Sequence, residues 1–414
     1  MNIVIIGNSA AGLNALETFR KYDSDSKITV ISKEKGKPYS RVLLPYFLRG
    51  KLQHDDMYIR DEKYFDTMNA EYIEKEVVKI DEVSKEVILD DNSKVSYDKL
   101  LIATGSSAAK PPIPGLEKEG VYHMWTKEDA ENLEPFFKEG KKVLVLGSGF
   151  VSLQAAWAAI TKGLEVTVIE LADRIMPSVL DSKGAQMLMD KIIEFGVDLR
   201  LNAMTKKIEK LENGGHRVFV EGQEPFDVDF VIVGTGVRPN VGFLEGTEVK
   251  IDRGILVDKG MRTNVDGIYA VGDVAQGPTT FGEANVIHAL WPTAMEMGKI
   301  AGANMSGKDF EYEGSLNMNV TQLFEITVAS MGMFMDGASE EVFIDIDEKN
   351  NNYVKIVLKD CIPVGGTVVG SSELVKLLGV MRPSIRKKDS KFNPEEILKG
   401  FHKKVASSQF DYRY

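Results

Sequence analysis

The chain has 414 residues and a formal net charge of −11. This length allows two or three domains with ample core, and the acidic balance argues against nucleic-acid binding, which usually needs a basic surface. The apolar runs fall short of the roughly 20 residues of a membrane-spanning helix. A single cysteine, Cys361, excludes a disulfide within the chain and a cysteine-ligated cluster, and the five histidines lack metal-ligand spacing. We therefore expect no metal site, and the cytoplasm is the default location.

Two stretches of the chain have the same pattern. Residues 2–34 and 141–170 each read as a strand, a Gly-rich turn, a helix and a second strand. The first strand of each is continuously apolar, as a parallel sheet buried on both faces requires. Two such units in one chain predict two nucleotide-binding domains.

The remaining segments follow in chain order. Residues 77–105 alternate like a hairpin around "DDNS", and the Pro-rich residues 106–115 are typical of a linker. Residues 187–199 predict an amphipathic helix that leads into a strand. Further buried strands, each ending in a turn, are expected at residues 229–240 and 267–275. From about residue 312 strands predominate, and the Lys-rich end is expected to be helical.

The first Gly-rich loop has the spacing of a dinucleotide-binding turn. Gly7 suits the tight turn and Gly12 the close contact of helix and strand, while Ser9 replaces the middle glycine. Glu34, after the second strand, is a candidate acceptor for adenosine ribose hydroxyls. Taken alone, the loop is as easily a glycine turn in an ordinary α/β unit. The residues expected to face phosphate from the helix N-terminus are Gly7, Ser9, Ala10, Ala11 and Gly12.

The second loop keeps two glycines, Gly147 and Gly149, and has serine at the third position. Glu170 ends the following strand, and a carboxylate there favours the free 2′-hydroxyl of NAD and repels the 2′-phosphate of NADP. Arg174 lies nearby in sequence and weakens that preference. Two such loops, each followed by an acidic residue, make purely structural turns the poorer interpretation.

These loops and three later segments, in this order, resemble the FAD-dependent pyridine nucleotide-disulphide oxidoreductases with the glutathione-reductase-like fold. The later segments are "LLIATGS" (100–106), "GTGVRPN" (234–240) and "YAVGDVA" (269–275), and the resemblance covers nearly the whole chain. It implies an α/β chain with two Rossmann-like domains and a small α+β C-terminal domain. The implied residues are Ala103, Thr104, Gly105 and Asp273 for FAD, with Asp273 on the ribityl chain, and Gly236 for NAD.

The resemblance also implies domain boundaries. An FAD-binding domain would take residues 1–108 and 238–311, an NAD-binding domain residues 109–237, and a C-terminal interface domain residues 312–414.

Within this family, "YSRVLLPYFLRG" (39–50) is similar to a segment of NADH:rubredoxin reductases and of the flavin half of the nitrite reductase large subunit. That similarity places Arg41 near the FAD ribose or phosphates. "LWPTAMEMGKIAG" (290–302) also looks like the NADH-oxidising subunit of phenylglyoxylate dehydrogenase. Trp291 and Pro292 would begin a helix whose positive end faces flavin N1 and C2=O. By residue type alone, Trp291 is equally well a core aromatic.

Val42 occupies the position where related coenzyme A disulfide reductases and NADH peroxidases hold a redox cysteine. Valine cannot form a thiolate, a sulfenic acid or a mixed disulfide. Cys361, in the last domain, is expected to be a small buried hydrophobe. Disulfide and peroxide substrates are therefore disfavoured, and electrons should leave from the flavin itself.

The implied chemistry is hydride transfer from NADH to flavin N5, with the protein supplying alignment and electrostatics. Phe150 and Val151 are the candidates for lining the space between nicotinamide and flavin. Gln154 stands where many relatives carry glutamate, which argues against a charged pairing there. Tyr46 is either a flavin neighbour or, more commonly for this residue type, a packed core tyrosine.

The last hundred residues resemble the C-terminal domain of the same reductases. The basic segment 381–391 either steers an acidic rubredoxin or ferredoxin or, more commonly, forms a solvated loop. The tail "SSQFDYRY" carries Phe410, Tyr412 and Tyr414, which are either part of a disordered terminus or contacts to a partner subunit.

The sequence thus predicts an FAD-containing NADH:acceptor oxidoreductase that prefers NAD to NADP. Its partner would be rubredoxin, ferredoxin or a larger redox complex. An NADH oxidase that uses O₂ and a flavoprotein scaffold or redox-sensing subunit are the alternatives. The acceptor, the direction and the oligomeric state are left open.

Overall fold

The computed structural model describes residues 1–212, 214–282, 285–334, 341–388, 393–395 and 398. They divide into two compact units. The first contains residues 1–109, 125–130 and 236–316, and the second contains the described parts of 110–124, 131–235 and 317–414. In the described part of the chain, no helix is both long enough and apolar enough to cross a membrane.

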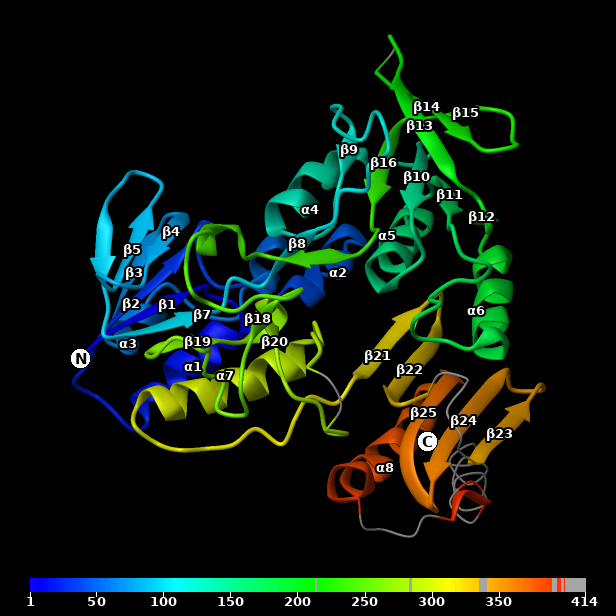
Figure 1. Cartoon of the computed structure of the whole chain (residues 1–414). Coiled ribbons are helices and arrows are strands. Elements are labelled where there is room, and N and C mark those ends of the chain that lie inside the picture. Colours follow the sequence, from blue (N-terminus) through cyan, green and yellow to red (C-terminus); the bar gives the residue numbers. More distant parts are fainter. Residues whose placement is uncertain (213, 283–284, 335–340, 389–392, 396–397, 399–414) are drawn as a thin grey trace, which may run out of the picture. The chain divides into compact units, whose positions relative to one another are not determined.

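The first unit is built on a parallel sheet with the order β19-β7-β1-β2-β3 (Figure 1). The central strand, β1, has four consecutive buried apolar residues, which explains why the sheet has no solvent-exposed face there. The predicted hairpin is present as β5 and β6 within a small antiparallel sheet. The bounds are β1 Asn2–Ile6, β2 Lys27–Ser32, β3 Ala70–Glu74, β4 Val77–Asp81, β5 Glu86–Leu89, β6 Lys94–Ser96, β7 Lys99–Ile102 and β19 Ile268–Ala270.

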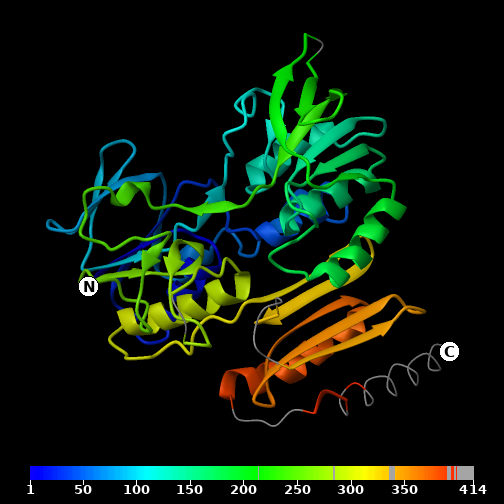
Figure 2. The ribbon, with the colours of Figure 1, turned by 45° about the vertical axis from the view of Figure 1, so that its right-hand side comes forward.

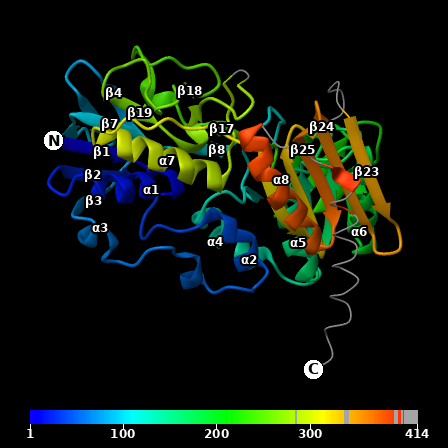
Figure 3. The same cartoon turned by 90° about the horizontal axis from the view of Figure 1, so that it is seen from below.

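Two helices, α1 (Ala10–Arg20) and α7 (Trp291–Met305), run side by side on this sheet (Figure 3). Trp291 and Pro292 begin α7, as the sequence predicts. Gly298 lets the two helices approach closely, because a Cβ there would lie 2.3 Å from the Ala11 carbonyl oxygen. The helix that follows the first Gly-rich loop is therefore held by a segment almost 300 residues further along the chain.

The smaller elements of the first unit connect these parts. The predicted linker is partly a strand, because β8 pairs with β17. The bounds are β8 Ser106–Ala108, β17 Val237–Pro239, β18 Ile255–Leu256, β20 Ala275–Gln276, α2 Leu44–Leu48, α3 Tyr64–Thr67, and the 3₁₀ turns η1 Arg41–Leu43, η2 His54–Met57, η4 Gly242–Leu244 and η5 Gly272–Val274. Helix α4 (Lys127–Leu133) begins in the first unit and ends in the second.

The second unit has its own parallel sheet, with the order β12-β11-β10-β16-β9. The amphipathic helix predicted at residues 187–199 is α6, which begins five residues earlier and leads into β12. The bounds are β9 Val121–Tyr122, η3 Glu134–Phe136, β10 Lys142–Leu146, α5 Phe150–Thr161, β11 Glu165–Ile169, α6 Ser182–Glu194, β12 Asp198–Arg200, β13 Thr205–Lys210, β14 His216–Val220, β15 Phe226–Val228 and β16 Phe230–Val233.

The last described part of the second unit is a five-stranded antiparallel sheet with the order β21-β22-β25-β24-β23 (yellow to orange in Figure 2). Helix α8 packs on one face of this sheet, and α6 packs against β25. The bounds are β21 Met318–Leu323, β22 Ile326–Gly332, β23 Glu341–Asp347, β24 Asn352–Lys359, β25 Ile362–Gly370, η6 Ser372–Leu374 and α8 Val375–Lys387. The fold is thus the predicted one, with two Rossmann-like sheets and a small C-terminal sheet domain.

Two local expectations are wrong. Cys361 is exposed, not buried, because it forms the two-residue turn between β24 and β25 together with Asp360. Both have positive φ angles, 53° for Asp360 and 62° for Cys361, as the tightest hairpin turns require. Residues 381–387 of the basic segment belong to α8 rather than to a loop, since Met381 and Ile385 are buried one helical turn apart. Residues 389–391 and the aromatic tail lie outside the described residues.

Candidate functional site

The first Gly-rich loop joins β1 to α1. Gly7 has a φ of 115°, and a Cβ on Gly12 would lie 2.0 Å from the Gly7 carbonyl oxygen, so the sharp turn and the close approach are both real. Ser9 caps α1 without a side-chain hydrogen bond. The helix itself therefore does not use the N–H groups of Ala10, Ala11 and Gly12. Such N–H groups, at the positive end of a helix, fit a pyrophosphate.

Three predicted or neighbouring side chains meet after β2. The Arg41 guanidinium forms an ion pair with Glu34, and the Tyr39 hydroxyl donates to the other Glu34 oxygen over 2.5 Å. Arg41 also donates to the Trp125 carbonyl oxygen over 2.9 Å. Burial, followed by smaller effects that include Glu34, raises the pKa of Tyr39, so its hydroxyl stays a donor. Separate roles are predicted for Glu34 and Arg41 from the sequence, whereas in the structure the two residues form one charged cluster.

Polar residues that were not predicted from the sequence hold the first Gly-rich loop in place. Asn8, inside the loop, donates to the Tyr72 hydroxyl over 2.9 Å, and Ser32 donates to Asn8 over 3.2 Å. These bonds tie the loop to β2 and β3 and fix its backbone.

The "ATG" segment and Asp273 lie at the ends of neighbouring strands, β7 and β19. Thr104 and Asn240 exchange two hydrogen bonds, Thr104 Oγ1 to the Asn240 carbonyl oxygen at 3.0 Å and Asn240 Nδ2 to the Thr104 carbonyl oxygen at 2.8 Å. These bonds hold the strand end around Ala103 and Gly105 in place. Ser106 donates to Asp273 over 2.9 Å. Burial raises the pKa of Asp273, while Ser106 and the charge of Arg41 act in the opposite direction.

The other residues predicted for the first unit are placed as follows. Trp291 packs, partly buried, against the core of the unit. Tyr46 is half-buried, with the Arg49 guanidinium 4.6 Å from its ring centre. Val42, the residue at the expected cysteine position, is 56% exposed. Gly236, predicted to contact NAD, falls in the first unit, where its carbonyl oxygen accepts from the Ala109 N–H.

The second Gly-rich loop joins β10 to α5, with Gly147 at a φ of 93° and Gly149 at the N-cap. Glu170, at the end of β11, accepts from the Ser148 N–H at 3.0 Å and from the Ser148 hydroxyl at 2.6 Å. Its other oxygen accepts from the Ala172 N–H at 2.8 Å. The carboxylate therefore lies directly against the loop. Phe150 and Val151 are half-buried at the start of α5.

Two further residues near the second loop, Arg174 and Gln154, have partners that are not predicted from the sequence. The Arg174 guanidinium pairs with Asp173 at 3.0 Å and lies 3.4 Å from the Leu180 carbonyl oxygen, so its charge is already engaged. Gln154 donates to Thr321 Oγ1 at 2.7 Å and to the Gln322 carbonyl oxygen at 2.9 Å. The amide therefore connects α5 to β21 of the C-terminal sheet.

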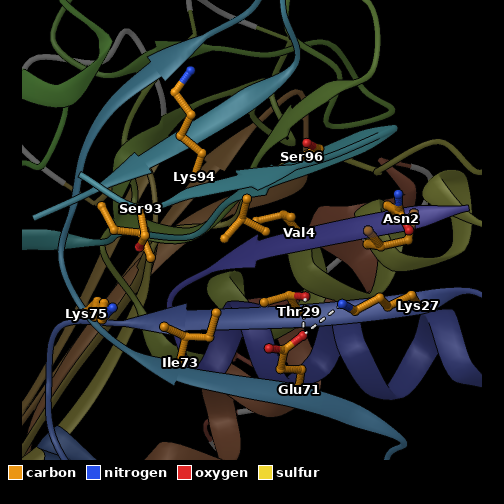
Figure 4. Close-up of a pocket in the computed structure, with 13 residues that line it drawn as sticks. Asn2, Val4, Lys27, Thr29, Glu71, Ile73, Lys75, Ser93, Lys94 and Ser96 are labelled. Atoms are coloured by element: carbon orange, nitrogen blue, oxygen red, sulfur yellow. Dashed lines mark hydrogen bonds and ion pairs between the residues drawn. The ribbon is translucent and has the colours of Figure 1, made fainter. Parts of the chain in front are cut away.

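A cavity of about 390 Å³ lies elsewhere in the first unit, between the parallel sheet and the β4–β6 sheet (Figure 4). Three lysines line it, and each has a carboxylate partner: Lys27 with Glu71 at 3.1 Å, Lys94 with Glu86 at 2.8 Å, and Lys75 with Asp91. The cavity shares no residue with either Gly-rich loop and offers an anion no unpaired lysine. Among the described residues, no group of three His, Cys, Asp or Glu side chains gathers as metal ligands.

The geometry defines a protein with two dinucleotide-binding Rossmann units, each with a Gly-rich turn, an open helix N-terminus and a carboxylate at the end of the second strand. The chain belongs to the pyridine nucleotide-disulphide oxidoreductase family, because residues 1–298 match the sequence pattern of that family. Residues 318–382 match the rubredoxin NAD⁺ reductase C-terminal domain. FAD and NADH, the cofactors expected from the sequence, are those of this family.

The chain is also similar to individual proteins over most of its length. The chain is 30% identical over 366 residues to subunit epsilon of the NADH-dependent phenylglyoxylate dehydrogenase of Aromatoleum evansii, covering 88% of this chain and 86% of that one. It is 32% identical over 346 residues to an NADH oxidase of Methanocaldococcus jannaschii, covering 80% and 76%. The solved structure of an NAD-dependent persulfide reductase from A. fulgidus has a TM-score of 0.86 and 31% identity, covering 94% of this chain and 77% of that one.

Proposed function

We propose that this chain is an FAD-dependent NADH:acceptor oxidoreductase that passes electrons to a partner redox protein. The observation that carries the proposal is that one chain holds two Gly-rich loops, each followed by an acidic residue after the second strand, together with a match to the rubredoxin NAD⁺ reductase C-terminal domain. The similarity to a subunit of a larger dehydrogenase supports a protein partner rather than a small diffusible acceptor.

The residues of the first unit would hold FAD, which supplies hydride acceptance and stepwise release of electrons when bound. The N–H groups of Ala10 and Ala11 would take the pyrophosphate charge, and Arg41, held by its ion pair with Glu34, would lie near the adenosine ribose or the phosphates. Asp273, fixed by Ser106, would accept a hydrogen bond from a ribityl hydroxyl. The N-terminus of α7 at Trp291 would favour negative charge on the reduced ring.

The residues of the second unit would hold NADH. Glu170 would share its oxygens between Ser148 and the 2′-hydroxyl of the adenosine ribose, which favours NADH over NADPH. Gly147 and Gly149 would leave room for the pyrophosphate, and Phe150 and Val151 would lie nearest the nicotinamide. We propose that Gly236 contacts NADH and that the domain boundaries lie at residues 108/109, 237/238 and 311/312.

The route of the electrons after reduction follows from Val42. Val42 has no thiol, so the segment of η1 cannot relay electrons through a disulfide. Electrons would therefore leave the flavin directly for the partner, rubredoxin, ferredoxin or a subunit of a complex. We place this reaction in the cytoplasm, where NADH is supplied.

Oxidation of NADH by O₂ is the second candidate function, because an NADH oxidase is among the similar proteins. A redox-sensing or scaffold subunit would also carry these loops, but it would turn over NADH slowly.

One experiment separates these functions. The purified yellow protein is titrated with NADH without oxygen and then mixed with oxidised rubredoxin, oxidised ferredoxin or air. Stoichiometric bleaching and rapid reoxidation by an iron protein are expected. Rapid reoxidation by air alone would favour the oxidase, and no bleaching by NADH would contradict the assignment of the second loop.

A further inference from the structure

A buried ion pair connects the second Rossmann unit to the C-terminal sheet. Lys355, on β24, and Asp181, at the N-cap of α6, lie 3.1 Å apart, and their side chains are only 1% and 8% exposed. The Tyr353 hydroxyl donates to the same Asp181 oxygen over 2.5 Å. The other Asp181 oxygen accepts from the Gly184 N–H at 2.9 Å, which caps the helix. One carboxylate thus receives three donors from two parts of the unit.

This cluster is a poor means of stabilising the fold. Burying a lysine and an aspartate removes their hydration, and apolar residues of similar volume often hold a core as well or better. The same sheet face continues through Thr367, opposite Lys355, and Ser330, opposite Thr367. Their buried hydroxyls have no hydrogen-bond partner within the described residues, which further lowers the stability of this face. The cluster is better explained by what it positions.

Asp181 ends a segment that begins next to Glu170, the carboxylate bonded to the second Gly-rich loop. Residues 171–181 run from Glu170 to α6, and Ala172 at their start donates to the Glu170 carboxylate. In the middle, the Met176 N–H lies 3.2 Å from the Ser148 carbonyl oxygen and 3.3 Å from its hydroxyl. Met176 has a φ of 47°, an unfavourable value for a residue with a side chain, so the surrounding contacts must hold it there.

The segment is closed by a short hydrogen-bonded turn. The N–H groups of Val179 and Leu180 donate to the Met176 carbonyl oxygen at 2.8 and 2.9 Å. A continuous path of contacts therefore links Ser148 in the Gly-rich loop, through Met176 and the turn, to Asp181 and β24. In this path Asp181 is the residue through which the C-terminal sheet contacts the segment.

We propose that Lys355 and Tyr353 are positioning residues for NADH, which act through Asp181 to hold residues 171–181 against the Gly-rich loop. The C-terminal sheet thereby becomes part of the NADH-binding apparatus rather than only a partner surface. The part of this inference that concerns NADH rests on the proposed function, whereas the part that concerns the segment stands on the geometry alone.

The charge state agrees with this role. Burial raises the pKa of Asp181, but the hydrogen bonds from Tyr353 and Gly184 and the charge of Lys355 outweigh burial and lower it. Asp181 therefore remains an anion, and as an acceptor for all three donors it fixes the direction in which α6 begins.

The test compares Lys355→Met with Ile356→Val in the full-length flavoprotein. Methionine keeps the unbranched stem of lysine but lacks its ammonium group. Ile356 is the next residue of β24 and is also buried, but it pairs with Gly366, which faces Leu378 and Met381 of α8. Ile356→Val removes one buried methyl group from the same strand without touching Asp181. A Tyr353→Phe variant removes only the hydroxyl donor.

Two readouts are measured. Hydrogen exchange of residues 172–180 should become at least about threefold faster in Lys355→Met and stay unchanged in Ile356→Val, because local opening follows local contacts. The dissociation constant for NADH, from anaerobic stopped-flow reduction, should rise about fivefold or more in Lys355→Met, as for residues coupled through one network. The limiting rate of flavin reduction should change less than twofold. Tyr353→Phe should show both effects more weakly.

The outcomes are distinguishable. Unchanged exchange in Lys355→Met would overturn the proposal, and so would equal changes in Lys355→Met and Ile356→Val, which would indicate only a structural role. Faster exchange with an unchanged NADH constant would overturn the link to NADH. If NADH does not reduce the wild-type flavin, the proposed function fails, and the exchange measurement still decides whether the cluster holds the segment.

Discussion

The replacement of Glu170 by glutamine isolates the charge of one carboxylate. In the structure this carboxylate accepts from the N–H and the hydroxyl of Ser148 and from the N–H of Ala172. A glutamine has one acceptor oxygen and one NH₂ group, so with its oxygen on Ser148 it keeps those two bonds and loses the negative charge and the bond from the Ala172 N–H. The loop should therefore stay in place, and the change in coenzyme preference should report the charge itself.

The size of the effect follows from two terms. A hydrogen bond to a charged group contributes about 1.5–3 kcal/mol and a neutral one about 1 kcal/mol, so NADH binding should weaken by about 1 kcal/mol, or roughly fivefold. Two unit charges about 4 Å apart repel by about 1 kcal/mol even at the dielectric constant of water. Relief of this repulsion against a doubly charged 2′-phosphate should strengthen NADPH binding by about 2 kcal/mol, or roughly thirtyfold. The preference for NADH should thus fall by about 150-fold.

The assay is anaerobic stopped-flow reduction of the flavin at varied NADH and NADPH concentrations, which gives a dissociation constant for each coenzyme. Glu34→Gln is the matched control, because Glu34 has the same position after the first loop and should leave the preference unchanged. A preference for NADH that stays within threefold of wild type in Glu170→Gln would refute the role of Glu170 in reading the 2′-hydroxyl.

Three further predictions concern single residues. Because desolvation raises the pKa of the partly buried Asp273 above its ordinary value of 3.8, the folded FAD-free protein should lose stability as pH rises from 3.8 through that raised pKa. Asp273→Asn should therefore be more stable than wild type at pH 7, with an advantage that shrinks towards pH 4 in urea unfolding, and it should retain less FAD; an advantage independent of pH would contradict this. Gly298→Ala should lower the melting temperature, because the overpacking cost of about 1–3 kcal/mol against Ala11 exceeds a helix-propensity gain of about 1 kcal/mol, and an unchanged melting temperature would count against the close helix contact. Cys361→Gly should raise stability by about 1 kcal/mol through relief of a left-handed backbone, with NADH turnover within twofold of wild type, whereas loss of turnover would reveal a thiol relay.

The features predicted correctly from the sequence are those that depend on residues close together in the chain. The two Gly-rich loops, the start of α7 at Trp291 and Pro292, and the hairpin between β5 and β6 each depend on residues within a few positions of one another. Glycine, proline and apolar runs determine the local backbone conformation, so turns, helix starts and strands can be predicted from them without knowledge of the fold.

The features that were missed depend on distant contacts. Lys355 is a single lysine within the apolar run of β24, and its partner Asp181 lies 174 positions away in the chain, so no local pattern predicts the pair. Gln154 likewise bonds to Thr321 across 167 positions. Cys361 was misplaced for the opposite reason. Its residue type favours burial, but the two-residue turn overrides that preference, because a hairpin tip leaves no room for a core side chain.

The packing of α1 against α7 also constrains how the protein is made. Ribosomes add about 5–20 residues per second, so the roughly 270 residues between the two helices take about 15–55 s to synthesise. During that interval the side of α1 that receives Gly298 has no partner from its own chain. The first nucleotide loop emerges early but is completed late, after the whole of β10 to β16 has left the ribosome. If the first loop binds the cofactor as proposed, the cofactor is therefore expected to load only after the second Rossmann unit has been synthesised.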